Sequence, residues 1–432
     1  MNLLLQRRFG PLFFTQFCGA FNDNLYKNAL IILIAFEGQS FFGMPPALLI
    51  NLVAALFILP FLLFSVSAGE CADKWDKARL MRLIKLLEII LMAVGALSLI
   101  THQLILVLLV IFLLGCHSAF FGPLKFAILP QHVPADQLLL ANGWVEMGTF
   151  VAILLGTNVG GLLMGAGEAG RMAVAVLVLL VAITGYGFSR AIPCAPSAMP
   201  DLRLSFNPLG EAWRNLRRAG ADRVVLVALL GNSWFWFYGA TFLTQFPSYT
   251  RDTLGGTEAV VTLLWTVLTL AVGTGSLMGA RLARGKLGYA LVPLGGLGMT
   301  FFAMDLASAH GVVMSVGSFT VMAFISSLRG VHVVVDTALI GFSAGAYIVP
   351  LYVLIQSRTA QTHRARMMGT TNLLNALFMV VASLLAVWLL GKGFTIPNLF
   401  LMVGVINAVA LAALVLACPM LLSGMSALWR RS

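Results

Sequence analysis

The first long apolar segment of the chain, near residues 11–36, carries an unusual concentration of polar side chains. These are Gln16, Asn22, Asp23, Asn24, Lys27 and Asn28. Helical spacing places Gln16, Asp23 and Lys27 on one side of a helix, together with Gly19. Ionisable groups inside an apolar helix are costly to bury and usually face a cavity or a charged partner. We expect this side to line a polar cavity. The alternatives are a simple Asp23–Lys27 pair and packing against neighbouring helices.

Two later apolar segments add charged groups that could act with this face. The segment near 104–125 ends in Gly122-Pro-Leu-Lys125, where Gly-Pro can bend a helix and free backbone groups. Lys125 either points into the cavity as an anion site or extends to the edge of the apolar layer. The segment near 139–164 carries Asn142 and Glu146 at helical spacing. We interpret Glu146 as a cavity carboxylate, with a position near the helix end as the alternative.

Polar side chains are sparser in the second half of the chain. The candidates are Asn232, Gln245, Asp305, Asp336, Gln356, Asn372 and Asn375. We expect Asp305 and Asp336 to lie near the ends of their helices, at an interface with water. Charged recognition is therefore predicted in the first half, with an apolar wall in the second. A ligand with a charged head and an apolar tail would suit such a cavity.

The composition indicates whether water or lipid surrounds this protein. Of its 432 residues, 60% are hydrophobic and 10% are charged, whereas soluble domains carry about 25% charged residues. So few charges could not cover a water-soluble surface, so we expect lipid to surround much of the protein. The net charge of +11 does not indicate nucleic-acid binding, because the basic residues gather in loops. Cysteines and histidines do not group at ligand spacings, so no metal, cofactor or enzymatic activity is expected.

Twelve apolar segments are long enough to span a membrane. They lie near 11–36, 45–68, 80–101, 104–125, 139–164, 171–190, 223–247, 258–280, 288–306, 335–357, 367–390 and 397–421. With both termini inside, 21 of the 27 Lys and Arg residues fall on the cytoplasmic side and four fall outside, as the positive-inside rule requires. A thirteenth apolar stretch, 312–328, would reverse every later loop if it crossed. We therefore interpret 307–334 as a re-entrant or surface-lying insertion at the outer face.

The basic, proline-rich stretch 191–222 divides the chain. It predicts a six-helix bundle over 1–190, a cytoplasmic linker, and a second six-helix bundle over 223–432, the layout of a parallel-repeat transporter. Asn207-Pro208 has the form of a helix N-cap followed by a first-turn proline. A short amphipathic helix there would gather Arg214, Arg217 and Arg218 on anionic lipid headgroups. A solvated basic linker is the alternative.

The loop after the second span resembles motif A of the major facilitator superfamily. It reads Gly69-Glu-Cys-Ala-Asp73-Lys74-Trp-Asp-Lys77-Ala-Arg79. A carboxylate at a helix start is stabilised there, and the basic residues hold the loop at the cytoplasmic side. We assign a conformational switch to Gly69, Asp73, Lys74, Lys77 and Arg79, with an ordinary basic turn as the alternative. Asp76 stands where the motif usually has glycine.

Longer motifs resemble the bacterial lysophospholipid transporter family over nearly the whole chain. The first span matches in Phe14-Thr-Gln-Phe-Cys-Gly-Ala-Phe-Asn-Asp-Asn-Leu-Tyr-Lys-Asn28. Spans four and five match in Gly122-Pro-Leu-Lys-Phe-Ala-Ile-Leu-Pro130 and Ala141-Asn-Gly-Trp-Val-Glu-Met-Gly-Thr-Phe-Val-Ala-Ile-Leu-Leu-Gly156. Spans ten and eleven match in Ala346-Tyr-Ile-Val-Pro-Leu-Tyr-Val-Leu-Ile-Gln356 and Asn372-Leu-Leu-Asn-Ala-Leu-Phe378.

The resemblance implies an all-α major facilitator fold with 12 transmembrane helices in the bacterial inner membrane. It implies transport of lysophospholipids, chiefly lysophosphatidylethanolamine, from the outer to the inner leaflet, with sodium or a proton as coupling cation. Some relatives carry a fused acyltransferase/acyl-ACP synthetase. This sequence ends soon after its last span, so we expect a separate partner enzyme. We assign Asp23 to the ethanolamine ammonium and Lys125 to the phosphate, with hydrogen bonds from Asn22, Asn24 and Asn28.

Two other functions compete with lipid import. A proton-coupled exporter of amphipathic drugs usually carries an arginine motif in span four and a Gly-Pro motif in span five. Span four here reads Gly115-Cys-His-Ser-Ala-Phe-Phe-Gly122, without arginine, and span five lacks the proline. A membrane receptor or anchor for a lipid enzyme is the second alternative. The polar first span and the two-half layout argue against that.

Overall fold

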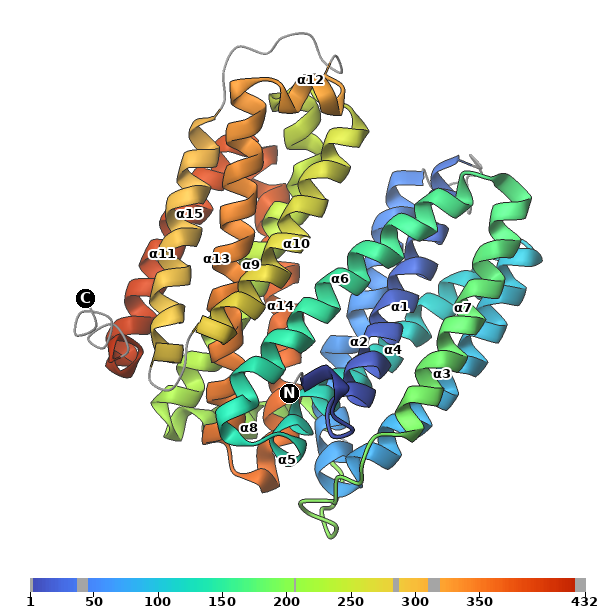
Figure 1. Ribbon diagram of the computed structural model, residues 1–432, viewed down its shortest axis with the longest axis vertical. Helices are drawn as coiled ribbons and strands as arrows, with labels where there is room; N and C mark the ends of the chain where they lie inside the picture. The colour runs from blue at the N-terminus through green and yellow to red at the C-terminus, as the bar shows by residue number, and fades with distance from the viewer. Residues whose placement is uncertain (1–2, 37–45, 206, 283–286, 310–318, 424–432) are drawn as a thin grey trace. The chain divides into compact units, whose positions relative to one another are not determined.

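A computed structural model describes residues 3–36, 46–205, 207–282, 287–309 and 319–423, and this part of the chain is built from helices (Figure 1). The long ones are α1 (Gly10–Phe36), α2 (Pro46–Lys74), α3 (Lys77–Ile100), α4 (Leu104–Ala127), α6 (Leu138–Met164), α7 (Gly167–Arg190), α9 (Arg223–Ser248), α10 (Glu258–Leu282), α11 (Leu287–Ser308), α13 (Leu328–Arg358), α14 (Arg364–Gly391) and α15 (Ile396–Ala417). The short ones are η1 (Leu3–Leu5), α5 (Leu129–His132), η3 (Ala135–Gln137), α8 (Pro208–Ala221), η4 (Tyr249–Thr253), α12 (Val321–Ile325), η5 (Gln361–His363) and η6 (Pro419–Leu422).

The twelve long helices coincide with the twelve predicted spans, so the predicted all-α membrane fold is confirmed. Eleven of the helices in the described residues are long and apolar enough to cross a membrane. The twelfth, α1, has 27 residues, and its polar side chains lower its hydropathy. Lipid offers no hydrogen bonds to the backbone, so each crossing must be a helix with its own bonds satisfied.

The ambiguous stretch 312–328 contains no long helix in its described part. Residues 310–318 lie outside the described residues. Beyond them, α12 has only five residues, about 8 Å at 1.5 Å per residue, and α13 begins at Leu328. Thr320 caps α12 by accepting a hydrogen bond from the Ala323 amide. Figure 1 shows α12 beside the start of α13.

The chain forms two compact units that are not continuous in sequence. The first contains Met1–Ala141, Val151–Ala219 and Gln356–Leu373, and the second contains Asn142–Phe150, Gly220–Ile355 and Leu374–Ser432. The change at residue 219 falls inside the stretch 191–222 that we interpret as a linker. No feature of the sequence predicts that residues 142–150 belong to the second unit or that residues 356–373 belong to the first. Three long helices, α6, α13 and α14, therefore each contribute residues to both units.

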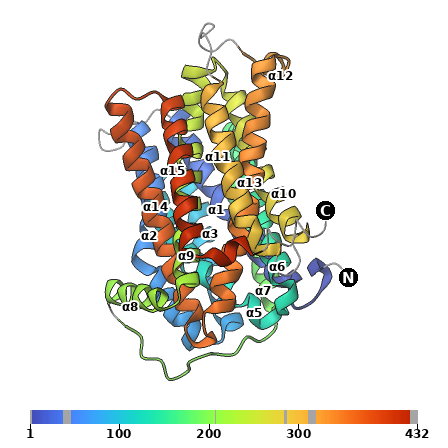
Figure 2. The same ribbon diagram turned by 90° about the vertical axis from the view of Figure 1, so that its left-hand side faces the viewer.

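An apolar core joins the helices of the first unit. It contains Leu25 and Tyr26 of α1, Val53 of α2, Met92 of α3 and Val178 of α7, among others. The Tyr26 hydroxyl lies 2.9 Å from the Ser98 hydroxyl of α3, which satisfies both buried groups. The same unit holds α8, a short helix that Figure 2 shows lying crosswise to α2. Asn207 caps α8 as predicted, because its Oδ1 accepts a hydrogen bond from the Gly210 amide at 2.8 Å.

One buried asparagine links three helices in the second unit. Asn407 of α15 donates to the Gly296 carbonyl and to the Thr300 hydroxyl of α11, each at 2.8 Å. Its Oδ1 accepts from the Trp234 indole of α9 at 2.7 Å. Hydrogen bonds between helices are one of the forces that hold membrane bundles together. Asn407 therefore fixes α15 against α9 and α11.

Candidate functional site

Asp23 lies in the middle of α1, in the first unit, and faces α4. The Ser118 hydroxyl of α4 donates a short hydrogen bond to Oδ2 of Asp23. Its other oxygen, Oδ1, is buried and accepts no hydrogen bond from any described residue. The whole side chain is 6% exposed. A buried carboxylate oxygen without a donor is costly, so Asp23 is poised to accept a positively charged or hydrogen-bonding group.

A network of charged side chains lies beside Asp23. Glu88 of α3 accepts a short hydrogen bond from Lys85, three residues earlier on the same helix. The Nε2 atom of His117 on α4 lies 3.1 Å from the same Glu88 carboxylate. Asn22 of α1 donates to Glu88 at 3.2 Å and to the Val178 carbonyl of α7 at 3.1 Å. The Glu88 carboxylate therefore joins α1, α3 and α4, and Asn22 extends the network to α7.

The charges of this network are removed from solvent. Lys85 and Glu88 are both 0% exposed. A glycine makes room for the ammonium group, because a Cβ added at Gly19 of α1 would lie 2.8 Å from Lys85 Nζ. The ammonium also lies 5.5 Å from the centre of the Phe121 ring, a distance at which a cation is attracted to the ring face. Buried charges that are paired in this way mark functional or switching elements in membrane proteins.

Lys85 is one of the 21 basic residues that the charge count places on the cytoplasmic side. It lies inside α3 and pairs with Glu88, so the predicted ratio becomes 20 inside to four outside, which leaves the topological argument intact. The prediction also missed Glu88, His117 and Ser118. A signal was present, since Lys85-x-x-Glu88 places opposite charges on one side of an apolar helix.

The other polar residues of α1 face several different partners. Lys27 donates to Asn24 Oδ1 at 3.0 Å and lies 5.0 Å from the centre of the Phe57 ring of α2. Lys27 therefore donates to Asn24 and forms no direct ion pair with Asp23 among the described contacts. Asn28 donates to the Thr157 carbonyl of α6 at 2.7 Å, and Gln16 is buried. Asn22 and Asn28 thus serve contacts between helices, in addition to any role toward a ligand.

Lys125 lies on the same side of α4 as Ser118. The helix continues through Pro123 and ends at Ala127, so the Gly-Pro pair does not interrupt it, and the break comes later. Seven residues are two turns, so Lys125 lies about 10 Å along the helix from the residue that binds Asp23. Its ammonium is 4.9 Å from the centre of the neighbouring Phe126 ring. Asp23 and Lys125 therefore border one strip along α4.

Asn142 and Glu146 are both buried on α6. They belong to the segment Asn142–Phe150, which packs with the second unit. In that unit the neighbouring Trp144 ring lies 5.5 Å from the guanidinium of Arg281 on α10. The predicted polar residues are thus divided, with the α1 group and Lys125 in the first unit and Asn142 and Glu146 in the second.

The predicted switch motif binds the start of α14. Asp73, at the end of α2, accepts hydrogen bonds from the Ala365 amide at 3.1 Å and from the Arg366 amide and Nε, each at 3.2 Å. Two free amides of a helix N-terminus are thereby satisfied by a carboxylate. Gly69 permits this approach, since a Cβ there would lie 2.5 Å from the Ala365 carbonyl oxygen. Asp73 is completely buried.

The linker helix α8 extends this switch. Glu211 lies 3.6 Å from Arg366 and also pairs with Arg214 and Arg218 of its own helix. Asn215 donates to the Thr370 hydroxyl of α14 at 3.2 Å. Arg214 and Arg218 are therefore turned partly toward Glu211, and the lipid-facing role proposed for them is shared with an ion pair. Motif A, the linker and α14 form one charged assembly in the first unit.

The basic members of the motif have different surroundings. Lys77 is 1% exposed, whereas Lys74 lies 5.9 Å from the centre of the Trp75 ring. Asp76, the departure from the motif, caps α3 by accepting from the Arg79 amide at 2.7 Å. It also accepts from the Ala195 amide and the Cys194 thiol, both at 3.0 Å. Burial acts to raise the pKa of Asp76, but these hydrogen bonds together lower it below its usual value.

Comparisons with known proteins agree with this architecture. A protein from Enterobacter sp. (strain 638) named "Lysophospholipid transporter LplT" is 27% identical over 80% of this chain and 79% of its own. One from Klebsiella pneumoniae (strain 342) with the same name is 28% identical over 79% and 78% of the two chains. The resemblance predicted from the span motifs is thus confirmed by these relatives.

Solved structures share the fold. The structure of a human organic anion transporter superposes with a TM-score of 0.73 at 16% identity, covering 96% of this chain and 99% of its own. The Escherichia coli fucose:proton symporter superposes with a TM-score of 0.69 at 12% identity, with the same coverage. The family model described as Major Facilitator Superfamily matches residues 12–334. This is more than half of the chain, and the protein belongs to the major facilitator superfamily.

Proposed function

We propose that this protein transports lysophospholipids, chiefly lysophosphatidylethanolamine, across the bacterial inner membrane. The observation that carries the proposal is the match over about four fifths of the chain to relatives named lysophospholipid transporter. Movement runs from the outer to the inner leaflet, with both termini in the cytoplasm. A separate acyltransferase/acyl-ACP synthetase re-acylates the product, so the transporter itself breaks no bond of its substrate.

Asp23 and Lys125 bind the headgroup in this proposal. The unpartnered Oδ1 of Asp23 suits a primary ammonium, which donates up to three hydrogen bonds. Lys125 lies farther along the same side of α4 and suits the phosphate. Charge-assisted contacts are stronger in a medium of low dielectric constant than in water. Asn24 and Lys27 complete the polar strip, and the acyl chain follows apolar surface.

A coupling cation drives the import. The buried network of Glu88 and His117 next to Asp23 supports this part of the proposal, because carboxylate and imidazole groups form proton relays in membrane proteins and a carboxylate can also coordinate sodium. Asn22 joins Glu88 to α1 directly, so a change at Glu88 reaches the residue next to Asp23. Sodium and a proton are distinguished by the ion gradient that the transport requires.

The test is uptake of labelled lysophosphatidylethanolamine by proteoliposomes. We expect Asp23→Asn and Lys125→Ala to reduce uptake at least about tenfold, since each removes a charge-assisted contact worth about 1.5–3 kcal/mol. Glu168→Gln and Lys392→Ala change exposed residues of the same charge as Asp23 and Lys125 and serve as controls. Normal uptake by both site variants at equal protein density would contradict the headgroup assignment. Absence of uptake by the wild-type protein under sodium and proton gradients would contradict the proposed function.

A further inference from the structure

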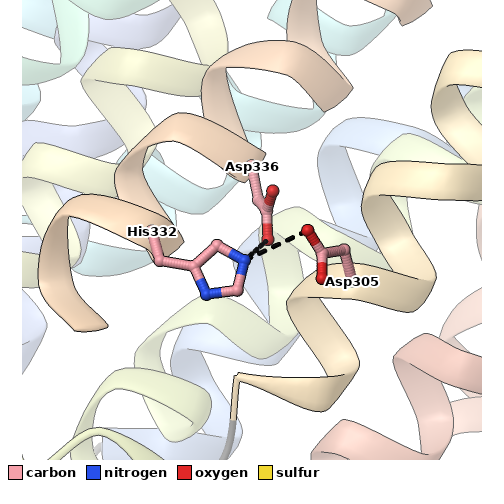
Figure 3. A group of neighbouring side chains, drawn as sticks. All are labelled: Asp305, His332 and Asp336. Carbon is pink, nitrogen blue, oxygen red and sulfur yellow. Dashed lines mark hydrogen bonds and ion pairs between the residues drawn. The ribbon is translucent and has the colours of Figure 1, made fainter. Parts of the chain in front are cut away.

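Three metal-ligating side chains converge at one end of the second unit (Figure 3). Asp305 lies in the last turn of α11, and His332 and Asp336 lie one turn apart near the start of α13. The sequence predicts no metal site, because its cysteines and histidines do not group at ligand spacings, and His332 lies 27 positions after Asp305. Only the pairing of α11 with α13 brings the three together. They lie outside the headgroup site and outside the switch motif.

The imidazole of His332 faces two carboxylates at once. Its Nε2 atom lies 3.1 Å from Oδ2 of Asp305 and 3.2 Å from Oδ2 of Asp336. A ring nitrogen carries at most one hydrogen, and the hydrogen bond that it forms goes to Asp305. The Oδ2 of Asp336 is buried and accepts no hydrogen bond from the described residues. Asp336 as a whole is 2% exposed, so water does not replace the missing donor.

We propose that Asp305, His332 and Asp336 bind a divalent metal ion of the zinc class. One imidazole and two carboxylates form a zinc ligand set, with the remaining position left to water. The separations of 3.1 and 3.2 Å between donor atoms are close to the roughly 3.4 Å edge of a tetrahedron with 2.1 Å bonds. A metal ion among the three atoms would satisfy the Asp336 oxygen that the protein leaves without a partner.

The nearest arginine of α13 does not pair with the cluster. Arg329 is the nearest basic residue along α13, one turn before His332. Its guanidinium donates to the Ala309 carbonyl at 2.7 Å and to the Thr253 carbonyl at 3.2 Å, which directs it to the main chain. The Ser308 hydroxyl lies 3.4 Å from the other oxygen of Asp305 and helps to orient that carboxylate. Arg329 therefore supplies no direct counter-charge to Asp305 and Asp336.

The cluster is open on one side. The side chains of His332 and Asp305 are 41% and 38% exposed, whereas that of Asp336 is 3% exposed. An ion can therefore enter past His332 and Asp305 and bind Asp336 at the base. The predicted topology places this end of the unit outside the membrane, where the ion would be taken from the external medium. Bound there, it would join the end of α11 to the start of α13.

The proposal is tested by calorimetric titration of Zn²⁺ into the purified full-length protein, prepared without a histidine tag, in detergent at neutral pH. We expect one ion to bind, and Asp336→Asn to weaken binding by about tenfold or more. Asp252→Asn changes an exposed carboxylate of the neighbouring η4 and should leave the affinity unchanged. The exposed thiol of Cys194 is present in all variants, so any binding there cancels in the comparison.

Absorption by bound Co²⁺ tests the site independently of the stability of Asp336→Asn. Co²⁺ bound by the wild-type cluster should give visible absorption bands that His332→Gln abolishes, which also tests the site if Asp336→Asn fails to fold. Failure of the wild-type protein to bind Zn²⁺ and Co²⁺ would overturn the proposal. So would equal affinity in the wild-type protein, Asp336→Asn and His332→Gln. A cluster that only gains and loses protons, and binds neither Zn²⁺ nor Co²⁺, would likewise overturn the proposal.

Discussion

Replacing Glu88 by glutamine removes one negative charge from the buried network of the first unit and preserves the shape of the side chain. The carboxylate of Glu88 receives the Lys85 ammonium, the His117 ring and the Asn22 amide. Glutamine keeps an oxygen for one donor, and its amide hydrogens face groups that also donate. Lys85 then remains in the interior of the unit without its counter-charge.

The expected loss of stability follows from the burial of this pair. Removing one partner of a fully buried ion pair costs about 3–5 kcal/mol, because the remaining charge has lost its partner and has no water. Lys85 and Glu88 are both 0% exposed, so no discount for solvent applies. The contact between Lys85 and the Phe121 ring is already present in the wild-type protein, so it does not offset this loss. We therefore expect Glu88→Gln to lower the free energy of unfolding by about 3 kcal/mol.

A second substitution separates loss of charge balance from loss of shape. Lys85→Met together with Glu88→Gln removes both charges, and the amide oxygen of the new glutamine still accepts from Asn22. Replacing a buried ion pair by neutral groups of similar size is often close to neutral. The double variant should therefore recover most of the lost stability. Glu258→Gln, at an exposed position, should change the free energy of unfolding by less than about 0.5 kcal/mol.

The assay is reversible unfolding in mixed detergent micelles, with helix content followed by circular dichroism. The reasoning would be refuted if Glu88→Gln unfolded with the free energy of the wild-type protein. It would also be refuted if the double variant were less stable than Glu88→Gln alone, because the unpaired Lys85 could then not be the cause. Uptake of lysolipid by the folded variants tests separately whether Glu88 takes part in cation coupling.

Three other substitutions test separate parts of the structure. Asp73→Asn should destabilise the contact with the start of α14 by about 2–4 kcal/mol and increase the accessibility of that helix to hydrogen exchange; unchanged exchange would contradict the contact. The Cys194 thiol has a raised pKa because Asp76 accepts its hydrogen bond, and the thiolate is the reactive form. Asp76→Asn should therefore speed maleimide labelling of Cys194 near neutral pH, and an equal or slower rate would count against this bond. The lowered pKa of Asp76 stabilises the fold above the ordinary aspartate pKa, and this contribution is lost as the pH falls through the lowered value. Asn22→Ala should lower the thermal midpoint and leave the KM for lysolipid close to that of the wild-type protein. A raised KM with an unchanged thermal midpoint would place Asn22 in the binding site.

The helices of this protein could be predicted closely from the sequence. Each predicted span except the tenth begins within about three or four residues of a long helix, since the change from apolar to polar residues at the lipid boundary decides both. The helix α13 begins seven residues earlier than its predicted span 335–357. Its first turns, near Arg329 and His332, are too polar to read as membrane from composition. Val333 and Asp336 in this part of α13 are buried, so packing in the second unit supports the helix there.

The contacts of the charged residues were harder to predict. His117 lies 29 residues after Glu88 in the sequence, and only the packing of α4 on α3 brings the two together. The charge count places Lys85 on the cytoplasmic side because it follows Lys77, Arg79 and Arg82 within one basic run. Its pairing with Glu88 depends on the burial of this part of α3 inside the first unit, which the sequence does not show. Asp305, His332 and Asp336 are likewise brought together by the pairing of two helices.

The hydrogen bonds in the first unit narrow the choice of residues that can meet a ligand. Both Asn22 and Asn28 already donate to groups on other helices, so donating to a headgroup would disturb a bond between helices. Oδ1 of Asn22 is buried and accepts no hydrogen bond from a described residue, but an amide oxygen attracts an ammonium less strongly than a carboxylate does. Asp23 differs, because Ser118 occupies one oxygen and the other has no donor. A new donor at Asp23 therefore gains a hydrogen bond without the loss of another. For this reason we place the ammonium at Asp23, and give Asn22 and Asn28 the task of holding α1 in position.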